Sequence, residues 1–262
     1  HKRVAVPKAF CVLWEHTRPR PKRAWAAQME VLQVVADICK KNGLEYFADW
    51  GTLLGAVRHQ GFIPWDDDID ICLKREDYNR LISILPKQLP HGFVMAGMYA
   101  GTERLRLAAE VPQLRVMADE TLWDFNDYMK YFHGFPYQRA GIDIFPLDGM
   151  PDDEKIIATK FKKIKFYKTI LLTAYSEMGK GATWYAALAK RVLIPICKHL
   201  NTEKLCNKLN AISKEYPIDK SPYVGGFLWG YGPQEKMPKE FLEPVEVEFE
   251  GHMFYAPRDW DG

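Results

Sequence analysis

A chain of 262 residues is long enough for one large domain or for one domain with an added subdomain. Hydrophobic residues make up 47% and charged residues 27% of it, as in ordinary soluble globular proteins, and the net charge of +2 gives no reason to expect a nucleic-acid partner. Five cysteines without a C-x-x-C pair favour reduced thiols in a cytoplasm over a disulfide framework or a zinc site. No stretch approaches the roughly 18 uninterrupted apolar residues of a membrane span.

The first quarter of the chain predicts a helix followed by a strand. Residues 22–41 have helical apolar periodicity, and Gly43 is placed to cap that helix at its C-terminus. Residues 44–48 are typical of a strand, and the segment Gly51-Thr-Leu-Leu-Gly55 follows it. Two glycines around a short apolar turn would let backbone amides approach a phosphate, although G-x-x-x-G is also a common packing motif.

The most informative segment is Gly61-Phe-Ile-Pro-Trp-Asp-Asp-Asp-Ile-Asp-Ile-Cys72, with four aspartates in five positions. If Ile69 and Ile71 lie on a strand, Asp68 and Asp70 project together from its other face. Two carboxylates so placed repel each other, and a cation removes that repulsion. Paired hard oxygen ligands suit Mg²⁺ or Mn²⁺ that also binds water and phosphate, so the motif predicts a metal site for a phosphate-bearing substrate.

Two alternatives to this metal site are simpler. An acidic surface turn is common, but here the last two aspartates alternate with isoleucines instead of lying among turn residues. A calcium-binding EF-hand loop would place Asp66, Asp68 and Asp70 at its first, third and fifth positions. Its sixth position needs glycine and holds Ile71, and its twelfth holds Asp77 instead of glutamate, which argues against calcium.

The middle of the chain supplies a second candidate strand aspartate. Residues 76–84 predict a helix, and residues 104–109 and 113–117 predict strands. In residues 140–148, Asp143 lies between two isoleucines, the same alternation as around Asp70. A buried strand aspartate is unfavourable unless it accepts hydrogen bonds, pairs with a cation or binds a metal.

Beyond Pro151 the pattern becomes helical and rich in lysine. Helices are predicted over residues 155–175, 183–199 and 202–216, the second kinked or ended by Pro195, and together they predict a packed helical lobe. A peripheral-membrane role is an alternative reading of the lysine cluster Lys162, Lys163, Lys165 and Lys168. Residues 223–231 predict a loop, and residues 245–255 a hairpin that turns at Glu250-Gly251.

Five sequence blocks, in order, resemble the LicD family of bacterial phosphocholine transferases, which is related to fukutin and fukutin-related protein. The similarity runs from about Lys22 to the end of the chain, and the first two blocks are highly specific. The blocks are Trp50-Gly-Thr-Leu-Leu-Gly-Ala-Val-Arg-His59, Gly61-Phe-Ile-Pro-Trp-Asp-Asp-Asp-Ile-Asp70, Arg75-Glu-Asp-Tyr78, Gly141-Ile-Asp-Ile-Phe-Pro-Leu-Asp148, and Phe249-Glu-Gly251 with Ala256-Pro257.

The resemblance implies an α+β, nucleotidyltransferase-like fold, in which a small mixed sheet is flanked by helices and followed by a mainly helical C-terminal lobe. With it we expect an N-terminal extension over residues 1–21, a catalytic core over 22–150, a helical lobe over 151–220, and a loop and hairpin over 221–262 that pack back on the core. The implied site comprises a glycine-rich turn, a D-x-D strand and a carboxylate on a later strand. These would be Gly51 and Thr52, then Asp68 and Asp70, then Asp143.

The resemblance further implies transfer of a phospho-alcohol from CDP-choline, or another CDP-alcohol, to a sugar hydroxyl with release of CMP. Asp68, Asp70 and Asp143 would hold Mg²⁺ or Mn²⁺, and Asp66 would be a further ligand or would support the others. Arg58, and after it Arg115, would bind phosphate, because a planar guanidinium does so bidentately. Choline would need an aromatic cage, for which the candidates are Trp123, Phe125, Tyr128, Tyr131, Phe132 and Trp229.

Two other functions stay open. A nucleotidyltransferase of the same fold would use an NTP and release pyrophosphate, and a non-catalytic glycan-binding relative would have lost an aspartate of the D-x-D pair, although both are present here. The acceptor, lipid-linked or not, could be a teichoic-acid sugar, lipopolysaccharide or another cell-surface saccharide, reached from the cytoplasmic face of the membrane. Family members usually continue beyond the segment matching residues 259–261 into a tyrosine-rich tail, and this chain ends at Gly262.

Overall fold

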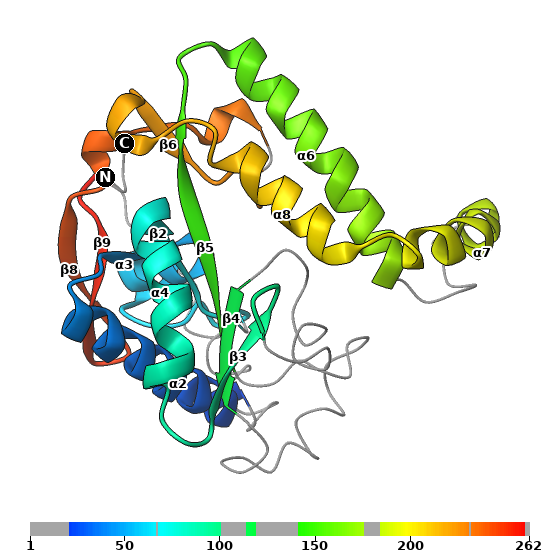
Figure 1. The fold of residues 1–262 in the computed structure, drawn as a ribbon. Helices are drawn as coiled ribbons and strands as arrows, with labels where there is room; N and C mark the ends of the chain where they lie inside the picture. The colour runs from blue at the N-terminus through cyan, green and yellow to red at the C-terminus, as the bar shows by residue number, and fades with distance from the viewer. Residues whose placement is uncertain are drawn as a thin grey trace.

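The computed structural model describes residues 21–66, 68–100, 114–118, 141–175, 184–230 and 232–259. Within them the protein is a mixed α/β structure with six α-helices and a curled mixed sheet (Figure 1). The helices are α2 Pro21–Asn42, α3 Trp50–His59, α4 Arg75–Gln88, α6 Glu154–Tyr175, α7 Trp184–Lys198 and α8 Thr202–Ser213. The strands are β1 Tyr46–Ala48, β2 Asp70–Lys74, β3 Phe93–Gly97, β4 Leu114–Ala118, β5 Gly141–Met150, β6 Tyr223–Gly225, β7 Met237–Pro238, β8 Pro244–Phe249 and β9 His252–Pro257.

The long strand β5 organises the sheet. Its N-terminal half lies between β2, which runs parallel to it, and β4, which runs antiparallel, so the order is β1-β2-β5-β4-β3. Its C-terminal end pairs instead with β6, which pairs with β7. The hairpin β8–β9 forms a separate two-stranded sheet that lies against β1 and α3. A parallel pair flanked by antiparallel neighbours therefore forms the centre of the described sheet.

The two faces of the sheet differ chemically, as the strand alternation predicts. On one face Ile71 of β2 and Ile144 of β5 belong to the main core, to which α2, α4 and the hairpin also contribute. On the other face Cys72 and Leu147 belong to a smaller apolar cluster with Val224 of β6. Because side chains alternate along a strand, Asp70 and Asp143 share the face of Cys72 and Leu147.

A separate core lies between α6 and α8. It includes Ile157 and Leu171 of α6 and Leu209 of α8, together with Phe227. In Figure 1, α6 and α8 extend side by side away from the sheet, and α7 lies at the far end of this arm. The domain boundaries at residues 22, 151 and 221 stay predictions.

A buried ion pair joins this arm to the sheet. Arg75, at the start of α4, donates from Nε and Nη2 to the two carboxylate oxygens of Asp148 on β5, at 2.7 Å and 2.6 Å. Its Nη1 donates to Asn210 Oδ1 of α8 at 2.7 Å. Because both charged groups are buried, the bidentate geometry is needed to offset their loss of water.

Several element predictions are confirmed. The helix α2 ends where predicted, since Gly43 has φ +60° and the amides of Gly43 and Leu44 donate back to Lys40 and Cys39 in a Schellman arrangement. The hairpin turns at Glu250 and Gly251 as predicted. The predicted strand over residues 104–109 lies outside the described residues.

Three local predictions need correction. The predicted turn over residues 51–55 is part of helix α3, because Asp49 caps a helix that begins at Trp50. Pro195, predicted to kink or end its helix, does not end it, because α7 continues for three residues to Lys198. The predicted loop over residues 223–231 begins with the short strand β6, which adds to the end of β5.

Candidate metal and phosphate site

Asp70 and Asp143 lie side by side at the centre of the sheet. They are register partners on the parallel strands β2 and β5, and the Asp143 amide donates to the Ile69 carbonyl at 2.9 Å. Neighbouring strands are about 4.8 Å apart, and register partners point to the same face. The two carboxylates that the sequence singled out on separate strands are therefore neighbours in the fold.

Further carboxylates surround Asp70. Its pKa is raised from 3.8 to about 9, first by burial and then by the negative charges of Asp68, Asp143, Asp49 and Asp66, in that order. Burial and like charges act in the same direction, because both disfavour the ionised form. This part of the sheet is thus an acidic cluster whose charge would be stabilised by a cation.

Arg115 lies on the other side of Asp143. It is the register partner of Asp143 across β4 and β5, and its Nη1 is 3.1 Å from Asp143 Oδ1 and 3.4 Å from Oδ2. Both residues are 8% exposed. Gly141, two residues before Asp143, allows the close approach of β4, since a β-carbon there would lie 2.7 Å from the Met117 β-carbon and the Val116 carbonyl oxygen and 3.0 Å from Arg115 Nε. Asp70, Asp143 and Arg115 therefore form a row across three strands, in which Arg115 balances part of the charge of Asp143.

The N-terminus of α3 reaches this row through Thr52. The buried Thr52 Oγ1 accepts a hydrogen bond from the Asp70 amide at 2.8 Å. Gly51 packs against the carboxylate of Asp66, with which a β-carbon at position 51 would overlap. A carboxylate at a helix N-terminus is stabilised by the helix dipole. Gly51 and Thr52, predicted as phosphate-binding, therefore position Asp66 and Asp70 in this structure.

Asp49 is a fifth carboxylate of the cluster and was not predicted as a site residue from the sequence. Its Oδ1 accepts from the Trp50 amide at 2.9 Å, and its own amide donates to the Asp70 carbonyl at 3.1 Å. Burial raises the pKa of Asp49. The hydrogen bonds from the Trp50 amide and the Cys72 thiol act in the opposite direction but do not outweigh burial. Reading residues 50–59 as a helix would have identified Asp49 as its N-cap and placed it beside the motif.

Arg58 lies farther from the carboxylates than the other predicted residues. It is exposed in the last turn of α3, six residues after Thr52, which corresponds to about 9 Å along the helix axis. The structure therefore brings together Asp66, Asp68, Asp70, Asp143, Gly51, Thr52 and Arg115, while Arg58 lies at the opposite end of α3.

The donor set of this cluster fits a hard divalent cation. Among the described residues no group of three or more His, Cys, Asp or Glu side chains already encloses a metal position. Mg²⁺ rarely needs such a cage, because it keeps several waters and binds through one or two carboxylates together with substrate phosphates. Two adjacent strand carboxylates with further aspartates beside them match that mode of binding.

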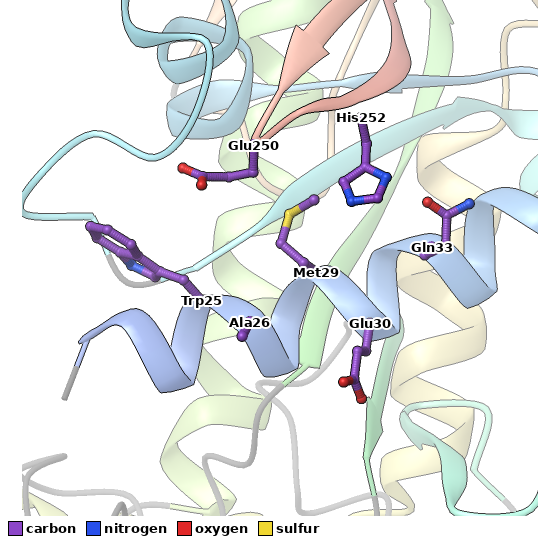
Figure 2. Close-up of a pocket in the computed structure, with 7 residues that line it drawn as sticks. All are labelled: Trp25, Ala26, Met29, Glu30, Gln33, Glu250 and His252. Atoms are coloured by element: carbon purple, nitrogen blue, oxygen red, sulfur yellow. The ribbon is translucent and has the colours of Figure 1, made fainter.

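A groove with a volume of about 690 Å³ lies between α2 and the tip of the β8–β9 hairpin (Figure 2). Trp25, Met29 and Glu250 line it together with Ala26, Glu30, Gln33 and His252, so it contains none of the predicted site residues. Trp25 connects the groove to the loop between α3 and β2, residues 60–69, which we call the aspartate loop. Trp25 Nε1 donates to the Asp66 carbonyl at 3.1 Å, and the Trp25 ring stacks on Phe62 with the ring centroids 4.8 Å apart. The groove therefore adjoins the aspartate loop through Trp25.

Of the aromatic residues considered for a choline cage, Trp229 is described. The Lys168 ammonium lies 3.5 Å from its ring centroid, and Phe145 meets it edge-on at 5.8 Å. One cation is therefore already bound at a face of Trp229. The other candidates, Trp123, Phe125, Tyr128, Tyr131 and Phe132, lie outside the described residues.

Residues 43–171 match the model of a family described as LicD/FKTN/FKRP, nucleotidyltransferase domain. The chain is 29% identical to the lipopolysaccharide cholinephosphotransferase LicD of Haemophilus influenzae, over 86% of this chain and 81% of that protein. It is 39% identical to the ribitol 5-phosphate transferase FKRP of Homo sapiens and of Mus musculus, over 20% of this chain and 10% of those proteins. The matched region contains every residue of the acidic cluster and Arg115, so the candidate site lies within the part of the chain that is similar to the LicD family.

Proposed function

We propose that this protein is a LicD-type transferase that moves phosphocholine, or a related phospho-alcohol, from a CDP-alcohol to a sugar hydroxyl of a cell-surface glycan or glycolipid. CMP would be the second product. The names of two relatives support this class of reaction, one a lipopolysaccharide cholinephosphotransferase and the other a ribitol 5-phosphate transferase. Both names describe the transfer of a phosphate that carries an alcohol.

The observation that carries the proposal is the pairing of Asp70 with Asp143 in register on β2 and β5, with Asp68 just before β2. A CDP-alcohol has a pyrophosphate, and an attacking hydroxyl oxygen must approach its negative charge. Carboxylates alone would repel such a substrate. An acidic cluster at this point is therefore favourable only if it binds a cation, for which Mg²⁺ or Mn²⁺ is the proposed cofactor.

Bound there, the cation would neutralise phosphate charge and orient the pyrophosphate. Asp68 and Asp70 would hold it, with Asp66 beside them. Asp143 would either complete this ligand set or accept the proton of the acceptor hydroxyl as its oxygen attacks the choline-bearing phosphorus. The bond from that phosphorus to the CMP oxygen breaks, and CMP leaves.

The two arginines would have different functions in this reaction. Arg115 is buried against Asp143 and is suited to hold that carboxylate in place. Arg58 is exposed at the far end of α3 and could meet an outer part of the donor or acceptor. Of the two, Arg115 would thus be closer to phosphates bound at the acidic cluster.

The first test is donor cleavage. The purified protein is incubated with Mg²⁺ and CDP-choline, with and without EDTA, and CMP is measured in the presence and absence of a lipopolysaccharide acceptor. We expect metal-dependent CMP release that Asp70→Asn abolishes. The matched control is Asp152→Asn, which removes an exposed carboxylate between β5 and α6 and should keep full activity.

A parallel panel of CDP-ribitol, CDP-glycerol, CDP-ethanolamine and an NTP distinguishes the alternatives. Cleavage of another CDP-alcohol in preference to CDP-choline would keep the reaction class and change the donor. Pyrophosphate release from an NTP would replace the proposal with nucleotidyl transfer. If no donor is cleaved with acceptor present, and CDP-choline does not alter the thermal stability with Mg²⁺, the transferase proposal is wrong.

No helix of the described residues combines the length and apolarity needed to cross a bilayer. We propose that the enzyme acts in the cytoplasm, at the inner face of the membrane, where nucleotide donors and lipid-linked acceptors would both be available. Addition of a lipid-linked acceptor to the donor assay tests this location, because it should accelerate CMP release more than the corresponding free saccharide does.

A further inference from the structure

Helix α7, Trp184–Lys198, is apolar on two opposite sides. Ile194 and Cys197 are buried, at 0% and 8% exposure, and this side of α7 packs in the helical arm. On the other side Leu188, Val192 and Ile196 are exposed by 54%, 62% and 56%. A helix of a globular domain normally presents polar side chains on its outer side, so this outer surface needs an explanation.

The exposed apolar residues form one continuous row. Leu188, Val192 and Ile196 are spaced by four residues and therefore lie one above the other on the helix. Leu193, 47% exposed, lies beside the row, and Leu200, 42% exposed, lies in the turn that follows the end of α7. We call these five residues the outer row. Scattered exposed apolar side chains are ordinary, whereas a row of this length marks a surface that contacts something apolar.

The exposed charges on α7, and on α6 that packs against it, are mainly positive, whereas α8 begins with the exposed Glu203. After Glu154, neither α6 nor α7 contains an acidic residue. Exposed cations lie on both helices, namely Lys162, Lys163 and Lys165 on α6 and Arg191 on α7. Phe166, next to these lysines, is itself 62% exposed. Large apolar side chains with flanking Lys and Arg are the composition of helices that lie in the surface of an anionic membrane.

The position of α7 suits such contact. Figure 1 shows it at the end of the arm formed by α6 and α8, remote from the sheet that carries Asp70 and Asp143. A flat surface could therefore reach α7 without covering the candidate site. The lysine Lys168, which the sequence analysis grouped with the cluster, is instead held against Trp229 and donates to the Leu228 carbonyl at 3.1 Å.

We propose that the outer row docks this protein on a bilayer that contains anionic phospholipids. The apolar side chains lie at the boundary between headgroups and acyl chains, and the exposed lysines and Arg191 contact the headgroup phosphates. A second copy of the chain fits this surface less well, because an isologous contact would bring two lysine clusters together without acidic partners from either α6 or α7. The inference rests on packing and charge and holds whatever the donor specificity of the enzyme.

The test is co-sedimentation of the full chain with vesicles. One set consists of phosphatidylcholine, and the other of phosphatidylcholine with about one third phosphatidylglycerol, a fraction of anionic lipid that gives a substantial surface potential. We expect binding to the anionic vesicles that weakens with added salt, and little binding to the neutral ones. The double variant Val192→Ser, Ile196→Ser should bind anionic vesicles at least tenfold more weakly, because it removes the two most exposed side chains of the row.

The matched control is Met253→Ser on β9, which removes an apolar side chain of equal exposure, 56%, away from the arm. It should bind as the unaltered protein does. Circular dichroism and thermal melting check that both variants keep the fold. Equal vesicle binding by the double variant and the unaltered chain would overturn the proposal. So would a sedimentation velocity result in which the unaltered chain is a dimer and the double variant a monomer, since a second copy would then cover the row.

Discussion

Replacing Asp70 with Asn should make the metal-free protein more stable while it abolishes turnover. In the folded protein Asp70 has a pKa of about 9, against 3.8 for the unperturbed group. A raised folded-state pKa of a carboxyl means that the folded protein holds a proton that the unfolded chain releases. The contribution of Asp70 to the free energy of unfolding is therefore fully present below pH 3.8 and is lost as the pH rises toward 9. Asparagine stays neutral and avoids this loss.

The size of the effect follows from the pH at which it is measured. Each pH unit above the unperturbed pKa of 3.8 lowers the free energy of unfolding by ~1.4 kcal/mol. At pH 8 the loss caused by Asp70 is therefore at most roughly 6 kcal/mol. Asp70 is not fully buried, and water and small movements of the neighbouring aspartates would reduce this ceiling. We expect Asp70→Asn to gain about 2 kcal/mol at pH 8, a rise in Tm of about 4–8 °C, and much less at pH 5.

The assay is thermal melting of both proteins in EDTA and in excess Mg²⁺ at the two pH values. Mg²⁺ should stabilise the unaltered protein at pH 8, because binding to the folded state alone raises its stability, and it should have a smaller effect on the variant. Asp152→Asn serves again as the control and should behave like the unaltered chain. The reasoning is refuted if Asp70→Asn is no more stable than the unaltered protein in EDTA at pH 8, or if Mg²⁺ stabilises both equally.

Three further predictions concern residues around the site. Arg75→Met leaves the Asp148 carboxylate buried and unpaired and should lower the unfolding free energy by about 3–5 kcal/mol, measured by urea denaturation. Thr52→Val removes the acceptor of the Asp70 amide and should lower stability by about 1–3 kcal/mol and reduce the rate of CMP release, with Thr159→Val on the exposed side of α6 as control. The Cys39 thiol, whose pKa burial raises to about 12, should not react with Ellman's reagent at pH 8 until the protein is unfolded.

The alternation of aspartate and isoleucine was the most reliable signal in the sequence. It predicted both the strand that carries Asp70 and the strand that carries Asp143, because period-two alternation around a charged residue has few other structural explanations. It did not predict that the two strands are parallel neighbours in register. That relation depends on how distant segments pair, and β5 also pairs with β4, which precedes it, and with β6, which follows it after about 70 residues that include α6, α7 and α8.

Residues 50–59 show where local pattern misleads. Two glycines suggested a turn, but each is required here for close packing within a helix: Gly51 against Asp66, and Gly55 against the Gly61 carbonyl. Both neighbours belong to the loop that follows the helix and precedes β2. Glycines that serve tertiary contacts cannot be distinguished locally from glycines that serve turns, and the error over this segment also hid Asp49.

The charge balance of the site explains why a cation is expected on one side of Asp143 and an arginine on the other. Arg115 supplies one positive charge, directed at Asp143 from β4. Asp70 lies on the β2 side, where the negative charges of Asp68, Asp49 and Asp66 raise its pKa. A fixed guanidinium on that side would neutralise the cluster permanently and leave no positive charge for a phosphate. A divalent cation neutralises the carboxylates and still has positions for phosphate oxygens and water, which is the property that a transferase acting on a pyrophosphate needs.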